Sequence, residues 1–318
     1  MGRQITDILL PDLSAARVMV TGASDGIGLG IARRLAAAGA ELLMPVRNAS
    51  KGQTAVDRIV AETPDARVRL LELDLASLDS VAALGATLNA QGEPINLLIN
   101  NAGVMTPPSR QVTQDGFELQ FGTNHLGHFA LVAHLFPLLL AGRARVTSQV
   151  SIVARSGGIH WDDLNWERSY SGMGAYKQSK IGLGLLGLEL ERRSRANGWG
   201  ISSNLSHPGV APTSLLAARP EVGRGKDSFS ARAIRWFSRN GILMGTLDSA
   251  PLPALLAATA PDLPQQLPVS ESPLFGPSGP AHFGGPPGEQ ALYPPLRSAE
   301  EAARLWTASE TMTGVKLG

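Results

Sequence analysis

Residues 17–28 read Arg-Val-Met-Val-Thr-Gly-Ala-Ser-Asp-Gly-Ile-Gly, and this stretch decides the fold. The β-rich run Arg17–Thr21 leads into a turn with Gly22, Gly26 and Gly28, after which a helical pattern begins. Glycine permits a tight turn and close approach of the backbone to a pyrophosphate, and the start of a helix offers free N–H groups. Glycines are common in turns, but a strand before them and a helix after them are typical of a nucleotide-binding turn.

The alternation of strand and helix patterns continues as far as residue 210. Unbroken apolar runs such as Leu97-Leu98-Ile99 suit a sheet that is covered on both faces. We therefore predict an α/β fold with one Rossmann-type, doubly wound parallel sheet. The predicted strands are Arg17–Thr21, Glu41–Val46, Val68–Leu73, Ile95–Ile99, Ala144–Val150 and Ile201–Ser206. The predicted helices are Gly28–Ala38, Gly52–Glu62, Leu78–Asn89, Asp115–Leu140 and Ala175–Asn197.

The regular alternation of predicted strands and helices ends after Gly209. We expect one domain over residues 1–318, with an N-terminal extension (1–14), a core (15–210) and a C-terminal extension that forms a substrate lid (211–318). Further helices are predicted at Ser228–Arg239, Leu252–Ala260 and Ala299–Thr311. The segment Pro261–Pro295 is rich in proline and glycine and could be a disordered linker, but its interspersed aromatic residues favour an ordered, irregular excursion.

The bulk composition excludes several classes of protein. The chain has 318 residues, of which 43% are hydrophobic, and a net charge of +1, so it gives no indication of a nucleic-acid partner. It has no cysteine, which excludes disulfides, thiolate metal sites and cysteine nucleophiles. No grouping of His, Asp and Glu has the spacing of metal ligands, so we expect no metal.

Two segments bear on the location of the protein in the cell. Residues 1–13 carry charges and lack the long apolar core of a signal peptide. The most apolar run, Phe129–Ala141, has about 13 residues, contains His134 and Pro137, and is too short to span a bilayer. We therefore expect a cytoplasmic protein without a membrane anchor.

Tyr176 and Lys180 lie four residues apart at the start of a predicted helix, so they share one helix face. A free tyrosine has a pKa near 10, and a neighbouring cation lowers it. A tyrosine whose pKa is lowered towards neutrality can act as a general acid or base. The spacing also occurs often by chance in solvated helices, so the rest of the chain must decide between the two interpretations.

Further polar residues lie at the ends of predicted strands. Asp74-Leu75 ends the third and Asn101-Ala102-Gly103 follows the fourth, at the sheet edge where open α/β folds bind ligands. Each motif alone could be ordinary turn chemistry. With the glycine-rich turn before them and Tyr176 and Lys180 after them, the chain resembles the short-chain dehydrogenase/reductase family over residues 15–215.

The resemblance implies four catalytic residues. Tyr176 would exchange a proton with the substrate oxygen, and Lys180 would lower its pKa and hold the nicotinamide ribose. Asn124, in the matching string Gly122-Thr123-Asn124-His125-Leu126-Gly127, would anchor a water-linked proton relay. A serine would orient the carbonyl: counting back from Gly157 favours Ser151 over Ser148. His125, His128 and His207 are expected to be structural.

The resemblance also implies a cofactor site. An arginine rather than an acid after the second strand accommodates a 2′-phosphate, and no carboxylate stands between Met44 and Lys51. NADP(H) is therefore favoured over NAD(H), although Arg47 could simply belong to a solvated basic turn. The expected cofactor-binding residues are Gly22, Ser24, Asp25, Gly26, Ile27, Gly28, Arg47, Asn48, Asp74, Leu75, Asn101, Ala102, Gly103, Tyr176, Lys180, Pro208, Gly209, Val210 and Thr213.

Two segments resemble the retinol-dehydrogenase-like branch of the family: Gly158–Asn165, and the C-terminal run that contains Arg304-Leu305-Trp306. The pigment reductases of that branch use a cysteine, which this chain lacks. The expected function is hydride transfer between the nicotinamide and a carbonyl or secondary alcohol. The family often forms homodimers through the helices that hold Asn124 and Tyr176, although the C-terminal segment could block that face.

The predicted lid, Val210–Arg239 with Pro261–Pro295, suggests an apolar and fairly bulky substrate. Its apolar residues could equally be a core patch over the sheet edge: Leu215, Leu216, Phe229, Trp236, Phe237 and Met244. One alternative function is a non-catalytic NADP(H)-binding regulator, but such proteins typically lose the tyrosine or the lysine. Another is a C=C reductase on the same fold, which commonly has an altered tyrosine spacing.

Overall fold

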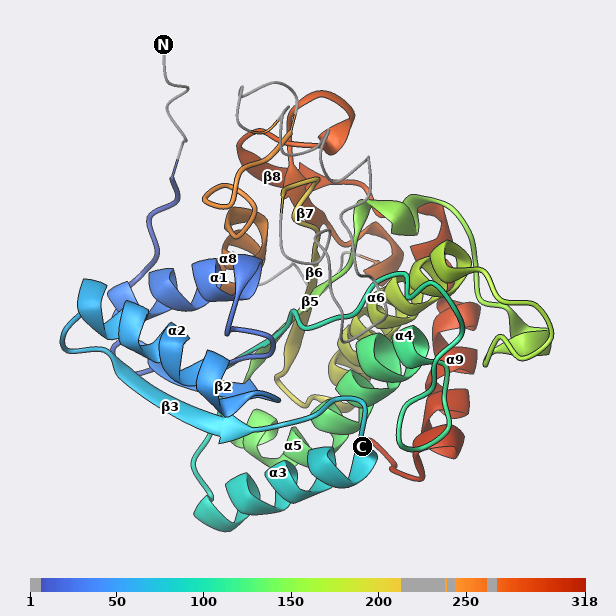
Figure 1. Cartoon of the computed structure of the whole chain (residues 1–318), viewed down its shortest axis with the longest axis horizontal. Coiled ribbons are helices and arrows are strands. Elements are labelled where there is room, and N and C mark those ends of the chain that lie inside the picture. The colour runs from blue at the N-terminus through green and yellow to red at the C-terminus, as the bar shows by residue number, and fades with distance from the viewer. Residues whose placement is uncertain (1–6, 213–237, 239–243, 262–267) are drawn as a thin grey trace.

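Strand β1 (Arg17–Val20) lies inside an eight-stranded sheet with the order β3-β2-β1-β4-β5-β6-β7-β8 (Figure 1). Neighbouring strands are parallel except for the antiparallel pair β7–β8 at one edge. The structure is a computed structural model that describes residues 7–212, 238, 244–261 and 268–318. The doubly wound parallel sheet predicted from the sequence is confirmed.

The remaining strands are β2 (Glu41–Val46), β3 (Arg67–Glu72), β4 (Leu97–Asn100), β5 (Arg145–Gln149), β6 (Ser202–Ser206), β7 (Leu274–Pro277) and β8 (Pro287–Gln290). The α-helices are α1 (Gly26–Ala37), α2 (Ala49–Glu62), α3 (Leu78–Gln91), α4 (Leu119–Phe121), α5 (Gly127–Ala141), α6 (Gly172–Asn197), α8 (Leu252–Thr259) and α9 (Ala299–Thr313). The shorter turns are η1 (Gly122–Leu126), η2 (Ile152–Arg155), η3 (Trp161–Asp163), η5 (Val269–Glu271), η6 (Pro280–His282) and η7 (Pro294–Leu296).

Helices cover both faces of the sheet. Alternate residues of one strand point to opposite faces, so Val18 and Val20 of β1 pack towards α1, α2 and α8, whereas Met19 packs towards α3, α5 and α6. Both apolar layers are closed to solvent, with Val18, Met19 and Val20 each 0% exposed. This double cover explains why the central strands are unbroken apolar runs.

The segment that was predicted as one helix over Asp115–Leu140 begins later, at Leu119, and contains a π-helical turn, η1. Because α4, η1 and α5 are continuous, the helical run Leu119–Ala141 has 23 residues and a mean hydropathy of 1.3 in its most apolar window. By length and composition alone this helical run could cross a membrane, although the apolar run Phe129–Ala141 within it is too short to do so. In this fold 72% of that window is buried, as in a core helix.

The segment Pro261–Pro295 is ordered where it is described, from residue 268 onwards, as the sequence favoured. It contains two strands that the sequence analysis missed: β7 continues the parallel sheet beside β6, and β8 pairs antiparallel with it. Each strand has four residues and carries a proline at one end, Pro277 or Pro287. Proline argues against a central strand, and β8 lies at the edge of the sheet, where it is tolerated. The predicted helix Ser228–Arg239 lies outside the described residues except for Ser238.

Helix α9 packs along α6 and reaches the π-helical turn (Figure 1). Its Trp306 is 2% exposed, lies edge-on to Phe129 of α5 with ring centroids 5.4 Å apart, and is covered by the guanidinium of Arg193 at 4.5 Å. Ser309 of α9 contacts His125 in η1 at 2.8 Å. The C-terminal helix therefore supports the segment of the chain that carries Asn124.

We predict that Trp306→Ala lowers the free energy of unfolding by about 3–5 kcal/mol, because it removes a large buried side chain and leaves a cavity. The measurement is a urea unfolding curve with the denaturant slope compared between variants. Leu247→Ala is the control: this side chain is 48% exposed, and its loss should change stability by no more than about 0.5 kcal/mol. Equal effects of the two variants would contradict the role of α9.

Candidate active site

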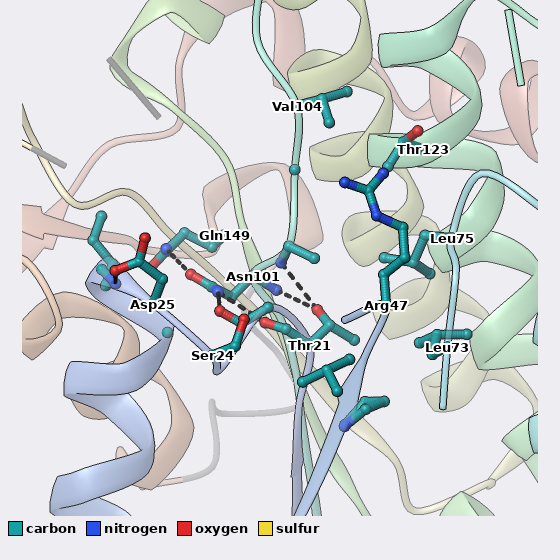
Figure 2. A pocket seen from close by; sticks show the side chains of 18 of the residues that line it. Thr21, Ser24, Asp25, Arg47, Leu73, Leu75, Asn101, Val104, Thr123 and Gln149 are labelled. Carbon is teal, nitrogen blue, oxygen red and sulfur yellow. Dashed lines mark hydrogen bonds between the residues drawn. The ribbon is translucent and has the colours of Figure 1, made fainter. Parts of the chain in front are cut away.

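A cleft of about 530 Å³ lies at the carboxyl ends of β1 to β5 (Figure 2). The chain winds outwards in one direction through β1, β2 and β3, and in the other through β4, β5 and β6. The cleft thus lies at the switch point between β1 and β4, where open parallel sheets bind ligands. Among the predicted site residues, the ones that line it are Gly22, Ser24, Asp25, Gly26, Ile27, Gly28, Arg47, Asn48, Asp74, Leu75, Asn101, Ala102, Gly103, Ser151, Tyr176, Lys180 and Pro208.

The glycine-rich turn has the backbone that its composition predicts. Gly22 and Gly26 have φ values of 68° and 55°, in the left-handed region that favours glycine. A Cβ on Gly28 would lie 2.1 Å from the carbonyl oxygen of Gly22, so this position admits no side chain. Asp25 caps helix α1 by accepting a hydrogen bond from the amide of Gly26 at 2.7 Å. The turn therefore brings the N-terminus of α1 to the edge of the cleft.

The ends of β2 and β3 form one side of the cleft. Arg47 is exposed and lines the cleft. Asn48 caps α2 by accepting a hydrogen bond from the amide of Lys51 at 2.9 Å. Lys51 lines the cleft as well. Asp74 turns its side chain into its own loop, where it accepts from the amide of Ala76 at 2.9 Å. The exposed charges that follow β2 in the cleft are thus both positive.

Hydrogen bonds between Thr21 and Asn101 join the ends of β1 and β4 (Figure 2). The Thr21 hydroxyl accepts from the amides of Asn101 and Ala102 at 2.9 and 3.0 Å, and the Asn101 side-chain amide donates to the Thr21 carbonyl at 2.8 Å. From the next strand, the amide of Gln149 donates to the Asn101 side-chain oxygen at 2.6 Å. These bonds hold three strand ends in one arrangement.

Tyr176 and Ser151 both line the cleft. The Ser151 side chain acts to lower the pKa of the Tyr176 phenol, and Tyr176 is 4% exposed. Lys180, one turn further along α6 and also 4% exposed, donates from Nζ to the carbonyl oxygen of Gln149 at 2.9 Å. The structure thus brings Ser151, Tyr176 and Lys180 to one place, as the sequence predicted.

The expected lowering of the tyrosine pKa is not found. Burial raises the pKa of Tyr176 to about 12 and outweighs the opposing, pKa-lowering effect of the Ser151 side chain. Burial also lowers the pKa of Lys180 to about 8. Both shifts have the same cause: burial disfavours the charged form of each side chain. The helix spacing alone did not reveal this burial.

Asn124 lies behind the cleft and does not line it. Its side chain is 0% exposed: Nδ2 donates to the Val104 carbonyl and to the Ser179 hydroxyl, both at 2.9 Å, and Oδ1 accepts from the Val104 amide at 2.8 Å. It therefore ties the segment after β4 to helix α6 at the residue before Lys180. Of the remaining predicted contacts, Gly209 and Val210 are not among the residues that line the cleft, and Thr213 is outside the described residues.

The histidines near the site have structural partners. His128 lies between the Asn124 carbonyl (2.9 Å) and the Thr21 hydroxyl (3.0 Å), and burial lowers its pKa to about 4. His207 contacts Gln290 of β8 at 3.2 Å, and burial lowers its pKa to about 4 as well. Among the described residues, no three His, Asp or Glu side chains gather as metal ligands would.

The cleft also contains residues that the sequence analysis did not assign to the site. They are Thr21, Pro45, Val46, Lys51, Leu73, Val104, Thr123, Gln149 and Val150. Several of them are next to predicted site residues in the sequence, and this is the one feature of the sequence that could have assigned them to the cleft. Ser148, the rejected alternative to Ser151, is 0% exposed and does not line the cleft.

The residues present fit a nicotinamide dinucleotide. The turn at Gly22 and Gly28 has no room for side chains, so its backbone can approach a pyrophosphate closely. The cleft offers the cations Arg47 and Lys51, and two buried oxygens, the Thr123 hydroxyl and the Gln149 amide oxygen, have no partner among the described residues. Buried polar atoms are normally paired, so these two are candidates for contacts with a bound molecule.

The chain is similar in sequence to known dehydrogenases and in structure to a solved protein. Human retinol dehydrogenase 13 is 37% identical over 301 residues, which cover 94% of this chain and 85% of that protein. Mouse polyprenol dehydrogenase is 41% identical over 212 residues, which cover 65% of this chain and 63% of that protein. A crystal structure of an uncharacterized protein from Mycobacterium paratuberculosis has a TM-score of 0.75 and 32% identity, with 97% of both chains covered.

The family model described as short chain dehydrogenase matches residues 16–222. This range contains the glycine-rich turn, the strand ends that form the cleft, and Ser151, Tyr176 and Lys180. The fold of that family binds a nicotinamide cofactor. The chain is a member of the short-chain dehydrogenase family of oxidoreductases, and its sequence is similar to members of the retinol-dehydrogenase-like branch.

Proposed function

We propose that this protein is an NADP(H)-dependent oxidoreductase that interconverts an apolar, fairly bulky alcohol and its ketone or aldehyde. The observation that carries the proposal is that Ser151, Tyr176 and Lys180 line the same cleft as the glycine-rich turn. The nicotinamide, when bound, supplies or accepts the hydride at its C4 carbon. The chain's own residues manage the proton and the charge on the substrate oxygen.

Tyr176 is the group that exchanges a proton with the substrate oxygen. Because the pKa of its phenol is raised to about 12, Tyr176 is protonated at neutral pH and can donate to a carbonyl oxygen without prior ionisation. Ser151 is placed to donate a hydrogen bond to the oxygen as it gains negative charge. In the opposite direction Tyr176 must first lose its proton, and the positive charges of Lys180 and of an oxidised nicotinamide both favour the phenolate.

Lys180 and Asn124 hold this arrangement. Lys180 is bonded to the carbonyl of Gln149, and Asn124 is bonded to the residue before Lys180 on α6. We propose that Lys180 contacts the nicotinamide ribose and that Asn124 anchors the water-linked proton relay that the family resemblance implies. Both side chains are buried, so the packing around them fixes their orientation.

The preference for NADP(H) rests on the side of the cleft formed by β2. Arg47 and Lys51 both line it, and both are exposed enough to reach a phosphate group. Guanidinium groups bind phosphate oxygens in pairs, which makes Arg47 the better candidate for a 2′-phosphate. An NAD(H) site would instead have a carboxylate at this position for the ribose hydroxyls.

The names of the relatives support an apolar substrate. Retinol and polyprenol, which the two similar dehydrogenases are named for, are alcohols with long apolar chains. We propose a substrate of this chemical class, without retinol itself being implied. The expected lid residues that would contact it lie outside the described part of the chain, apart from Met244.

The remaining expectations on partners and location are proposals as well. We propose a cytoplasmic protein without nucleic-acid partners. Helix α9 already covers part of the surface of α6 and contacts η1. These two segments hold Tyr176 and Asn124, and the family often forms homodimers through the helices that carry these residues. A homodimer through that face would therefore require α9 to move, and we propose that the protein does not dimerise there.

We predict that Tyr176→Phe lowers kcat for ketone or aldehyde reduction by about 10²–10⁴-fold, the usual contribution of a positioned general acid, while the Kd for NADPH changes little. Turnover is followed by NADPH absorbance with a panel of apolar carbonyl compounds. Tyr293→Phe is the matched control, because the buried Tyr293 hydroxyl has no partner among the described residues and its loss should leave kcat unchanged.

The same experiment separates the alternatives. A regulator would bind NADPH without turning over any carbonyl compound. A C=C reductase would consume NADPH with unsaturated substrates only and would not need the Tyr176 hydroxyl. Turnover of ketones that survives Tyr176→Phe would refute the proposed mechanism.

We predict that Arg47→Asp weakens NADPH binding by about 10–100-fold, because a charge-assisted hydrogen bond to phosphate is lost and a repulsive charge is gained. NADH binding should be unchanged or stronger. Both dissociation constants are measured by titration calorimetry. Arg58→Asp, an exposed residue of α2 outside the cleft, is the control for the change in net charge. Equal losses for the two cofactors would exclude a contact between Arg47 and the 2′-phosphate.

We predict that the burial of Lys180 gives stability a specific pH dependence. Its pKa is about 8 in the fold and near its ordinary value of 10.5 in the unfolded chain, so between these values the unfolded chain binds more protons. Stability should therefore rise from pH 7.5 to 9.5 by on the order of 2 kcal/mol from this residue alone. Urea unfolding at both pH values should show this rise in the wild type and in Lys177→Met, and its loss in Lys180→Met.

A further inference from the structure

The orientation of the Gln149 amide follows from a chain of hydrogen bonds that begins at the backbone. The carbonyl oxygen of Thr21 can only accept, so the atom of Asn101 that contacts it at 2.8 Å is the donor Nδ2. The other side-chain atom of Asn101 is then the acceptor Oδ1, and the atom of Gln149 that contacts it at 2.6 Å must be Nε2. The remaining atom of Gln149 is therefore the acceptor Oε1.

This oxygen has no hydrogen-bond partner in the part of the chain that the structure describes. Gln149 is 4% exposed, its Oε1 is buried without a hydrogen bond, and the residue lines the cleft. Its backbone oxygen is already bonded to Lys180. A buried acceptor without a donor is unfavourable, and such groups are rare outside functional sites. The adjacent Ser148 also has an unpartnered hydroxyl but does not line the cleft, so it serves as an internal comparison.

The chemistry of the oxygen limits what it can bind. An amide oxygen needs a donor, and the phosphates of a dinucleotide offer only acceptors at neutral pH. The donors on such a molecule are the ribose hydroxyls and the amino groups of the adenine and of the nicotinamide carboxamide. A contact between Gln149 and the bound cofactor must therefore involve one of these groups.

The position of Gln149 in the sheet selects between the two halves of the cofactor. Arg47 and Asp74 follow β2 and β3 on one side of the switch point, whereas Gln149 ends β5 on the other side, two residues before Ser151. Figure 2 shows Gln149 and Arg47 on opposite sides of the cleft, with Thr21 between them. If Arg47 contacts the 2′-phosphate beside the adenine, Gln149 faces the nicotinamide half.

We infer that Gln149 is a cofactor-binding residue whose side-chain oxygen accepts a hydrogen bond from the ribose or carboxamide of the nicotinamide half of NADP(H). The inference rests on the proposed function, because it requires a nicotinamide dinucleotide in this cleft. The single amide has two roles: Nε2 fixes the end of β4 through Asn101, and Oε1 binds the ligand. The cofactor thus completes a hydrogen-bond chain that runs from Thr21 through Asn101 to Gln149.

The test is the affinity of purified variants for two ligands, measured by titration calorimetry. NADP⁺ contains the nicotinamide half, whereas adenosine 2′,5′-bisphosphate contains only the adenine half and the 2′-phosphate. Gln149→Met keeps the volume of the side chain and removes both the acceptor and the Nε2 donor to Asn101, so the Kd for NADP⁺ should rise about tenfold or more. The Kd for adenosine 2′,5′-bisphosphate should stay within about twofold of the wild type, and Ser148→Ala should change neither.

Two results would overturn the role of Gln149: an unchanged Kd for NADP⁺ in Gln149→Met, or an equal loss of both ligands, which would indicate general damage to the cleft. If Gln149→Met does not fold, Gln149→Glu decides, because it keeps an acceptor facing the cleft but cannot donate to Asn101. Its Kd for NADP⁺ should stay within about threefold of the wild type, and a loss of about tenfold or more would refute the inference.

The wild type separates this inference from the proposed function. A wild-type protein that binds neither NADP⁺ nor adenosine 2′,5′-bisphosphate would overturn both. Wild-type binding that the variants leave unchanged would overturn the role of Gln149 alone, and the test of Tyr176 by turnover would be unaffected.

Discussion

The join between Thr21 and Asn101 is the constraint on which the site depends. It links β1 and β4, the two strands between which the sheet reverses its direction of winding, through three buried or half-buried hydrogen bonds. Leaving one of these groups unpaired in the interior would cost about 1–3 kcal/mol. The glycine-rich turn starts at the next residue, and Gln149 reaches Asn101 from β5. Through the carbonyl of Gln149 the same arrangement extends to Lys180.

The site is polar in a part of the sheet where polar groups are expensive to bury. Unpartnered buried atoms gather at the carboxyl ends of the central strands, on Asn100, Ser148, Gln149 and Ser206. A fold chosen for stability alone would place apolar residues there. Departures of this kind from local rules are typical of functional sites, where the compensating interaction comes from a bound molecule.

Burial shifts the pKa values of Tyr176 and Lys180 so that the neutral form of each side chain is favoured. The pKa of Tyr176 is raised and that of Lys180 is lowered, in both cases because burial disfavours the charged form. The closed environment also strengthens every hydrogen bond made to a charge that develops during a reaction. Helix α9 contributes to this closure from outside, since Trp306 packs on Phe129 and Ser309 contacts His125 beside Asn124.

The sequence by itself determined the alternation of strands and helices, the glycine-rich turn and the spacing of Tyr176 and Lys180. These features are local: they depend on periodicity, on the φ angles open to glycine and on residues one helical turn apart. The cleft could be assembled from them because parallel strands bring their carboxyl ends to one edge.

Only the tertiary structure decided the rest. Strands β7 and β8 have four residues each and carry prolines, so nothing in their composition marks them, and they exist because β6 offers a free edge for pairing. The direction of the Gln149 amide depends on Asn101, 48 positions away in the chain. The pKa of Tyr176 depends on burial by several elements at once, whereas the sequence showed only the neighbouring lysine. Each of these properties is set by contacts between distant segments, which no local pattern records.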